Sequence, residues 1–352
     1  MLVAFAAQAQ TSVTVYGNAD LALNNFFTTS TTGAKNQDNN IVAGGLSTSN
    51  IGFRGEREIA TGLKATFQFE FEVDQTVEKT EFKSRAGLVG LSGNIGALTI
   101  GRRTTLMKST IDALDAGDGT NTAGFIGDNA RDSRLDDRIT YSSPLFSGFS
   151  ADVQIGLGST PKDTTAAGVV STTNNGKKDD SMSYALNFVS GPLTARMATE
   201  TIKGNSSKKV KIGTGADSNL VYQVLAPSVT TDDRKNDAFG ATYDFGVAKV
   251  FFVDTKMKQG SGSTMVTFDT QTLGVRVPFG DYTVVAEAGN GKAKLTDSTI
   301  KANVEALQLT LMYSLAKDTT VYFAYGSESI AHPSFTKKGE QTNTQIGLRY
   351  KF

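Results

Sequence analysis

Hydrophobic and polar residues alternate strictly through the stretch from Leu63 to Asp74. Its odd positions are Leu, Ala, Phe, Phe, Phe and Val, and its even positions are Lys, Thr, Gln, Glu, Glu and Asp. Successive side chains of a β-strand point to opposite faces, so the stretch predicts a strand with one apolar and one polar face. A helix would mix both kinds of residue around its circumference. At roughly 10 to 12 residues, such a strand is long enough to cross a bilayer at a tilt.

Similar stretches recur from residue 13 to the last residue, and we count about sixteen of them. Long polar connections alternate with short turns rich in Gly, Pro and Asn. The longest connections are residues 28–45, 104–132, 159–180 and 203–235, and residues 220–225 are a candidate for one more short strand. This layout predicts an all-β fold, a transmembrane antiparallel β-barrel of about 16 strands with long extracellular loops and short periplasmic turns. A soluble sandwich would give shorter strands without this alternation of connections.

The overall composition agrees with a barrel. Hydrophobic residues make up 39% of the 352 residues, the mean hydropathy is −0.21, and no run of 18 apolar residues occurs. A barrel carries its apolar surface on alternate residues, so its average hydropathy stays low. Lys plus Arg and Asp plus Glu both number 35, which gives no indication of a nucleic-acid partner.

The chemistry of enzymes has little support in this sequence. It contains no cysteine and one histidine, His332, which lies in a polar loop beside Pro333. Disulfides, zinc clusters and cysteine nucleophiles are therefore excluded, and no metal or other cofactor is expected. Catalysis of the Ser-His-Asp kind would depend on His332 alone, without a serine or acid positioned nearby. We therefore expect a protein that is not an enzyme.

The N-terminus resembles an export signal. Residues 1–10 are apolar and small, and Ala7-Gln8-Ala9 has the form of a signal-peptide cleavage site. We expect cleavage between Ala9 and Gln10, which leaves residues 10–352 as a single barrel domain; the alternative is an ordinary N-terminal strand. Export and the lack of cysteine together indicate a bacterial envelope protein that is not stabilised by disulfides.

Several short motifs resemble the general porins of β-proteobacteria, in order along the whole mature chain. They are Ser12–Gly17, Gly52–Glu56, Gly62–Ala65, Val89–Gly93, Gly101-Arg102, Arg134–Asp136, Tyr141–Pro144 and Gly347–Phe352. The resemblance implies a sixteen-stranded homotrimeric pore in the outer membrane, surrounded by lipid and lipopolysaccharide. It also implies that the third long loop folds into the lumen, and that the insertion machinery reads Phe352 together with the alternating Ile346, Leu348 and Tyr350.

The residues of such a constriction can be proposed from the sequence. The loop of residues 104–132 contains Asp112, Asp115, Asp118 and Asp128. Arg54 lies on the polar face of its strand, and Arg134 and Arg138 are expected to share one face with Asp136 between them. Arg85 matches a basic residue of the family, and Arg103 and Lys64 are further candidates.

Arginines that face carboxylates across a narrow gap create a transverse field, and rings of fixed charge select ions in pores. We therefore predict an outer-membrane porin for passive diffusion of ions and small hydrophilic solutes. The anion preference should be weak, since Glu70, Glu72 and Asp152 also face the lumen. In an alternative interpretation the arginines are solvated ion pairs without effect on selectivity. Alternative functions are an adhesive or structural barrel that works through its loops, or an outer-membrane enzyme.

Overall fold

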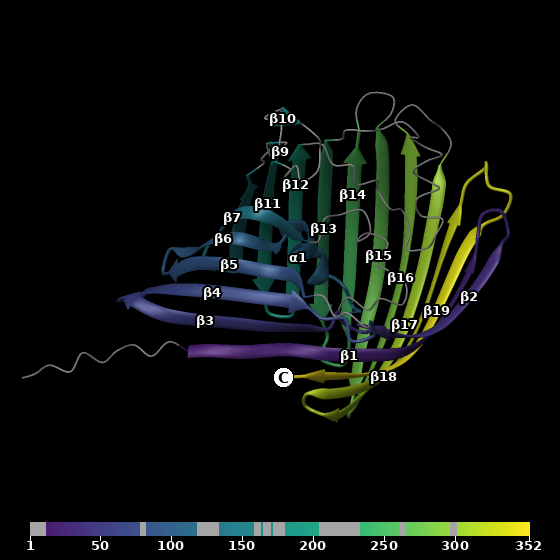
Figure 1. The fold of residues 1–352 in the computed structure, drawn as a ribbon, viewed down its shortest axis with the longest axis horizontal. Coiled ribbons are helices and arrows are strands. Elements are labelled where there is room, and N and C mark those ends of the chain that lie inside the picture. The colour runs from purple at the N-terminus through teal and green to yellow at the C-terminus, as the bar shows by residue number, and fades with distance from the viewer. Residues whose placement is uncertain are drawn as a thin grey trace, which may run out of the picture.

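The strands of the chain close into a barrel (Figure 1). The computed structural model describes residues 12–77, 82–117, 134–157, 163–164, 170–171, 180–203, 233–260, 265–295 and 301–352. β1 (Ser12–Thr29) pairs along one edge with β19 (Gly339–Lys351). Along its other edge it pairs first with β3 (Asn50–Ala60) and then with β2 (Lys35–Ala43). The first and last strands therefore seal the wall.

The remaining strands follow in chain order, each antiparallel to the one before it. They are β4 (Leu63–Glu72), β5 (Lys83–Gly93), β6 (Gly96–Thr104), β7 (Arg134–Ser142), β8 (Phe149–Gly156), β11 (Asp180–Ser190), β12 (Leu193–Lys203), β13 (Arg234–Asp244), β14 (Lys249–Gln259), β15 (Val266–Phe279), β16 (Tyr282–Leu295), β17 (Ala302–Ala316) and β18 (Thr319–Ala331). β9 (Asp163–Thr164) and β10 (Val170–Ser171) form a separate small sheet.

The 17 strands of the main sheet occupy 16 positions around the wall, because β2 and β3 follow each other beside β1. The predicted antiparallel barrel of about 16 strands is thus confirmed. In the described part of the chain, no helix combines the length and the apolar character that crossing a membrane requires.

The wall is inside-out relative to a soluble protein. On β19, Ile346, Leu348 and Tyr350 are about half exposed on the outer face, whereas Gln345 and Arg349 at alternate positions are buried toward the lumen. The same alternation is seen on β17, where Leu307, Leu309 and Leu311 are exposed and Gln308 and Thr310 between them are buried. Lipid offers no hydrogen-bond partners, so the backbone bonds must all close within the sheet and the outer side chains must be apolar.

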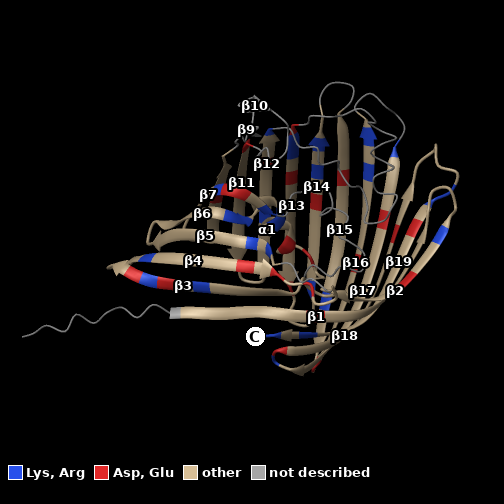
Figure 2. Cartoon of the chain, viewed as in Figure 1, with Lys and Arg blue, Asp and Glu red and all other residues tan. Residues whose placement is uncertain are grey.

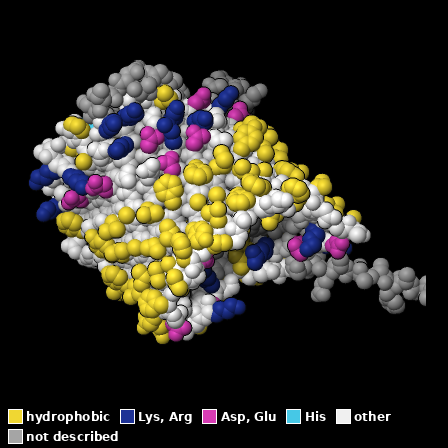
Figure 3. All heavy atoms as spheres, turned by 180° about the vertical axis from the view of Figure 1, so that it is seen from behind, with side chains coloured by type: hydrophobic (Ala, Val, Ile, Leu, Met, Phe, Trp, Pro, Cys, Tyr) yellow, Lys and Arg dark blue, Asp and Glu magenta, His cyan; other side chains and the backbone are white. Residues whose placement is uncertain are grey.

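Toward the long connections, the polarity of the two faces reverses on β14 to β17. Outward positions become charged, as at Asp254, Lys256 and Lys258. Inward positions become apolar and are buried, and together with Ile330 of β18 they form a cluster of Met257, Val266, Phe268, Ala293, Ala302 and Val304. Charged residues accordingly gather at the upper ends of the strands between β12 and β17 (Figure 2), above a belt of hydrophobic side chains (Figure 3). The reversal marks where the wall leaves the hydrocarbon.

Four elements were not predicted from the sequence: β2, α1 and the short strands β9 and β10. Part of the expected loop of residues 28–45 forms the last two residues of β1 and all of β2. The connection of residues 104–132 contains α1 (Leu106–Asp112), whose N-cap Thr105 accepts a hydrogen bond from the backbone N–H of Lys108 at 3.1 Å. The export signal of residues 1–9 and the candidate strand of residues 220–225 lie outside the described residues.

A cation on the outer face should separate the hydrocarbon-facing level from the level above it. Leu309→Lys, in the middle of the apolar outer face of β17, should destabilise the folded barrel by about 2–4 kcal/mol, whereas the matched change Glu305→Lys on the charged level should cost about 0–1 kcal/mol. Urea unfolding of the protein refolded into phospholipid vesicles measures both. Equal costs at the two sites would contradict the assignment of the hydrocarbon boundary.

Candidate functional site: the loop inside the barrel

The described start of the connection that follows β6, residues 105–117, carries α1 against the inner wall of the barrel (Figure 1). One face of this segment is apolar, and its residues are at most 4% exposed. The wall strands meet it with small or medium side chains, which leave room for a helix between the wall and the lumen. The cluster consists of Leu106, Met107, Ile111 and Leu114 from the loop and Ala185, Ala198, Ala238 and Val253 from β11 to β14.

A second anchor holds the end of this segment to β15 and β16. The carbonyl oxygen of Ala116 accepts hydrogen bonds from Arg276, at 3.1 Å from Nε and 2.7 Å from Nη2. The carboxyl groups of Asp115 and Glu287, both largely buried, share a hydrogen bond. Such a bond requires a proton on one of the two groups. Gly274 leaves the space into which Ala116 fits.

Arg54 is the exposed arginine of the predicted set. Its guanidinium carbon lies 5.0 Å from the ring centroid of Tyr16 on the neighbouring strand β1. The Tyr16 hydroxyl donates to Glu70 Oε2 at 3.0 Å and accepts from Gln68 Nε2 at 2.6 Å. Arg54 therefore rests on a ring whose position is fixed from two sides, and a cation above an aromatic face is attracted to it.

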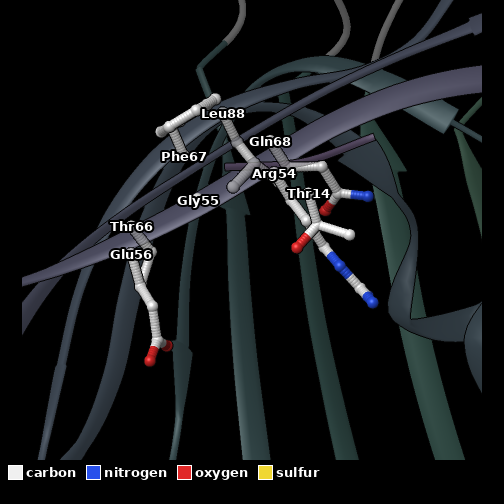
Figure 4. Close-up of a pocket in the computed structure, with 8 residues that line it drawn as sticks. All are labelled: Thr14, Arg54, Gly55, Glu56, Thr66, Phe67, Gln68 and Leu88. Carbon is white, nitrogen blue, oxygen red and sulfur yellow. The ribbon is translucent and has the colours of Figure 1, made fainter. Parts of the chain in front are cut away.

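Arg54 also borders a hollow of about 340 Å³ on the inner wall. Figure 4 shows Arg54 and Glu56 pointing to the same side of the ribbon and Phe67 to the other. The lining residues are Thr14, Arg54, Gly55, Glu56, Thr66, Phe67, Gln68 and Leu88. Glu56 is engaged by Lys64, whose Nζ lies 2.6 Å from Oε1, so the hollow has a cationic and a neutralised end.

Arg85 is held by two carboxylates. Its Nε lies 2.6 Å from Glu70 Oε1, and its Nη1 lies 3.5 Å from Glu72 Oε2. The strand register explains why it faces the lumen although Val89 and Leu91 on the same strand face outward. Glu70 pairs with Ala86 and Phe71 pairs with Ser84, so Arg85 is the extra residue of a bulge that reverses the parity of β5.

The three remaining arginines differ in their surroundings. Arg138 is 1% exposed and lies against Gly156, where a side chain would collide with its guanidinium. Arg103 Nη1 donates to Thr99 Oγ1 at 2.5 Å. Arg134 is half-buried, and the charges that act on it are those of Arg85, Glu70, Asp112 and Glu72.

The expected position of Asp136 between Arg134 and Arg138 is wrong. Asp137 has a φ of 53°, and the register of β6 and β7 shifts at this point. Asp136 pairs instead with Arg102 at 2.7 Å. Arg102 is on the same face of β6 as the exposed Leu98 and Ile100, because alternate residues of a strand share one face. This ion pair therefore lies on the outer side of the wall. A bulge that the sequence does not reveal therefore removes one carboxylate from the lumen.

The predicted acidic residues of the loop also separate. Asp112 is half exposed at the end of α1, where it accepts from Lys108 Nζ at 2.6 Å. Asp115 is buried in the second anchor, and its Oδ1 accepts from the N–H of Gly117 at 2.7 Å. Asp118 and Asp128 lie outside the described residues. Of the aspartates predicted for this loop, Asp112 is therefore the exposed one among the described residues.

The C-terminal residues close the wall. Phe352 and Gly17 exchange two backbone hydrogen bonds, at 3.0 and 3.1 Å. His332 lies in the loop before β19, where its Nδ1 bonds with Ser334 Oγ at 2.6 Å and its ring packs on Phe335. Burial lowers the pKa of His332. In the described part of the chain, no group of three or more His, Cys, Asp or Glu residues is placed to hold a metal ion.

These features define a class of protein, a closed membrane barrel whose lumen contains an inward loop and paired charges. The sequence profile of a Gram-negative porin family matches residues 1–329, so the chain belongs to that family. As a member of it, the protein is a porin of the bacterial outer membrane and forms a channel there.

Comparisons with individual proteins agree with this assignment. The chain is 27% identical to outer membrane porin protein 32 of Delftia acidovorans, over 99% of this chain and 96% of that protein. It is also 27% identical to an outer membrane porin protein of Bordetella pertussis, with the same coverage. Among solved structures, an anion-selective porin from Comamonas acidovorans has a similar fold, with a TM-score of 0.74, 22% identity and coverage of 97% of this chain and all of that chain.

The second anchor can be tested through Gly274. A Cβ atom there would lie 2.6 Å from the Cβ of Ala116, so Gly274→Val should push the loop away from the wall and into the lumen. We expect a lower single-channel conductance in planar bilayers. Thr272→Val, on the same face of β15 and nearly unchanged in shape, is the control. Equal conductance of the wild type and Gly274→Val would show that the loop does not narrow the pore here.

Proposed function

We propose that the protein is a charge-selective diffusion channel for ions and small hydrophilic solutes, narrowed by the loop that carries α1. Arg54 is the main selecting residue in this proposal, and the preference is weakly for anions. The observation that supports it most directly is the contrast between Arg54 and Arg85. Arg54 is exposed and rests on a neutral ring, whereas Arg85 is engaged by Glu70 and Glu72.

The physical basis is the field of a fixed charge in a narrow passage. One unit charge about 4 Å from another acts with roughly 1 kcal/mol in bulk water and with about 4 kcal/mol at an effective dielectric constant near 20. A cation already matched by a carboxylate adds little to the field that a passing ion meets. Of the predicted arginines, we therefore assign the larger effect to Arg54 and Arg134, and smaller effects to Arg85, Arg103 and the buried Arg138.

The anion preference also has support from relatives. The structurally similar porin from Comamonas acidovorans is described as anion-selective. In the present chain, Asp115 is taken up by the second anchor, and Glu56, Glu70 and Asp112 are each bound by a cation. Most of the described lumen carboxylates named here are thus neutralised, which leaves an excess of positive charge at Arg54. The predicted constriction loop also contains Asp118, which lies outside the described residues.

The proposal includes partners. We propose a homotrimer in the outer membrane; an outer-membrane protein of similar fold from Vibrio cholerae, OmpT, is described in a trimer form. Residues 1–9 act as a leader, and residues 10–352 form the mature barrel domain. The insertion machinery reads Phe352, with Tyr350, Leu348 and Ile346 outward on the closing strand. Outer-membrane lipid and lipopolysaccharide surround the wall. No chemical step is required for this function, and adhesion through the loops is the competing hypothesis.

Arg54→Gln should shift the reversal potential in a salt gradient toward cations. The anion-to-cation permeability ratio should fall a fewfold, since the removed charge acts with roughly 1 kcal/mol on an ion about 4 Å away. Planar bilayers with a KCl gradient measure this shift. The effect should shrink at high ionic strength, because salt screens exposed charges.

The matched control is the double variant E56Q/K64Q, which removes one charge of each sign at a neighbouring ion pair that does not hold Tyr16. It should leave the reversal potential near that of the wild type. If R54Q leaves the potential unchanged, or if the double variant shifts it as far as R54Q does, the assignment of selectivity to Arg54 is wrong. If the correctly folded protein shows no conductance in planar bilayers, the proposed pore function itself is wrong.

A further inference from the structure

The connection between β18 and β19 begins with a tight turn, at the end of the barrel that carries the long connections. The turn is His332-Pro333-Ser334-Phe335, and the N–H of Phe335 donates to the carbonyl oxygen of His332 at 2.9 Å. Proline at the second position of such a turn has its backbone angle preset. The turn brings the rings of His332 and Phe335 together, with their centroids 5.2 Å apart.

Two contacts tie this connection, residues 332–338, to other parts of the barrel. The N–H of Lys337 donates to the carbonyl oxygen of Thr31 at 2.9 Å, in the turn between β1 and β2, and the Lys337 side chain lies over Gly33. Phe335 packs against the inward apolar cluster of β14 to β18. Because that cluster faces inward, the connection lies on the lumen side of the wall. Long connections face the cell exterior in outer-membrane barrels, so this is the outer mouth of the channel.

The hydrogen bonds of His332 define its protonation state. Its Nδ1 accepts from the backbone N–H of Ser334 at 3.2 Å. A backbone N–H is a donor, so Nδ1 carries no proton here, and the ring is neutral with its proton on Nε2. The Ser334 hydroxyl, 2.6 Å from the same nitrogen, then donates to it as well. In a protonated ring Nδ1 is itself a donor: the hydroxyl can turn to accept, but the backbone N–H loses its acceptor.

The charged groups around this connection do not favour a proton on His332. In the described part of the chain they are Lys337 and Lys338 of the connection, Lys35 of β2, Lys301 before β17, Glu305 of β17, Glu328 of β18 and Glu340 of β19, while Lys256, Lys258, Asp269, Lys292 and Lys294 of β14 to β16 point outward. Lys338 Nζ lies 3.1 Å from Glu305 Oε2, and Glu328 accepts from Gln341 Nε2 at 2.9 Å. Burial is the effect that acts on His332, and it lowers the pKa of the imidazole.

We propose that His332 is an acid-sensitive switch, which holds residues 332–338 against the inner wall of the outer mouth while its ring is neutral and releases them when the ring is protonated. Protonation breaks the bond from the Ser334 N–H and places a charge in a partly buried site, and both effects oppose docking of Phe335. The inference depends on this connection alone and not on the selectivity of the lumen.

The direction of the pH dependence follows from the position of the imidazole in the docked state. Burial lowers the pKa of His332 there, so the docked state gains stability from the neutral ring. This contribution is complete above the usual histidine value of about 6.5 and is lost as the pH falls through the lowered value. Release is therefore expected in mildly acidic medium, and docking at neutral pH.

The test uses a tryptophan in place of Phe335, because the chain contains no other tryptophan. The variant F335W is refolded in detergent micelles, and its emission and its quenching by acrylamide are followed as the pH is lowered. We expect the emission to move to longer wavelengths and the quenching to increase, with a midpoint below about pH 6.5. The β-sheet signal in circular dichroism should stay constant and shows that the barrel remains folded.

The matched control is H332N/F335W. An asparagine oxygen accepts from the N–H two residues further on, as in an Asx turn, and it does not titrate. The emission of this variant should stay at its neutral-pH position over the whole range. An equal shift in H332N/F335W, no shift in F335W, or a midpoint above the usual histidine value would each overturn the proposal.

Hydrogen exchange measured by mass spectrometry gives a second readout without the tryptophan. After correction for the intrinsic effect of pH, residues 332–338 of the wild type should lose protection below the midpoint, whereas those of H332N should keep it. Equal protection of the wild type above and below the midpoint would overturn the proposal even if F335W itself failed to dock. Neither readout measures current, so a failure of the proposed pore function and a failure of this switch are distinguishable.

Discussion

The structure depends on one constraint, that the backbone of a membrane wall finds no hydrogen-bond partner in lipid. The sheet must therefore close on itself, and the pair formed by Gly17 and Phe352 does this at the end of the chain. Closure then fixes the direction of every side chain. Because the outer face belongs to hydrocarbon, most charged residues at the level of the apolar belt are directed into the lumen, where they find partners among themselves; the pair of Arg102 and Asp136 is an exception on the outer side.

Asp20 illustrates the consequence for the interior. Its side chain is fully buried, and it accepts hydrogen bonds from the N–H groups of Leu46 and Ser47, at 2.9 and 2.8 Å, and from the Tyr322 hydroxyl at 2.6 Å. A short inward loop between β2 and β3 is thereby tied to β18 on the other side of β1 and β19. The lumen is thus lined by connected polar groups, and inward loops are part of the same network.

The alternation of residues was sufficient to predict the barrel and its long wall strands other than β2, because a period of two over so many long segments is typical of strands. The direction of particular arginines was not predictable. Bulges at Arg85 and at Asp136-Asp137 reverse the parity of their strands, and one extra residue leaves no mark in a pattern of hydrophobicity. α1 was missed because seven residues are too few for a helical period to be recognised. A signal for it did exist, since Ala185, Ala198 and Ala238 interrupt otherwise polar inner faces.

The same reasoning bears on how charge can act in the lumen. A lone arginine side chain is long and flexible. Salt screens such an exposed charge, and a passing ion meets only the field averaged over its positions. Arg54 differs because Tyr16 holds it, and Tyr16 is itself held by Gln68 and Glu70. Glu70 in turn binds Arg85, so one carboxylate fixes the ring beneath one cation and neutralises the other. In the function proposed above, the two basic residues at this place have different roles: Arg54 supplies the field, and Arg85 holds Glu70, which supports the Tyr16 ring.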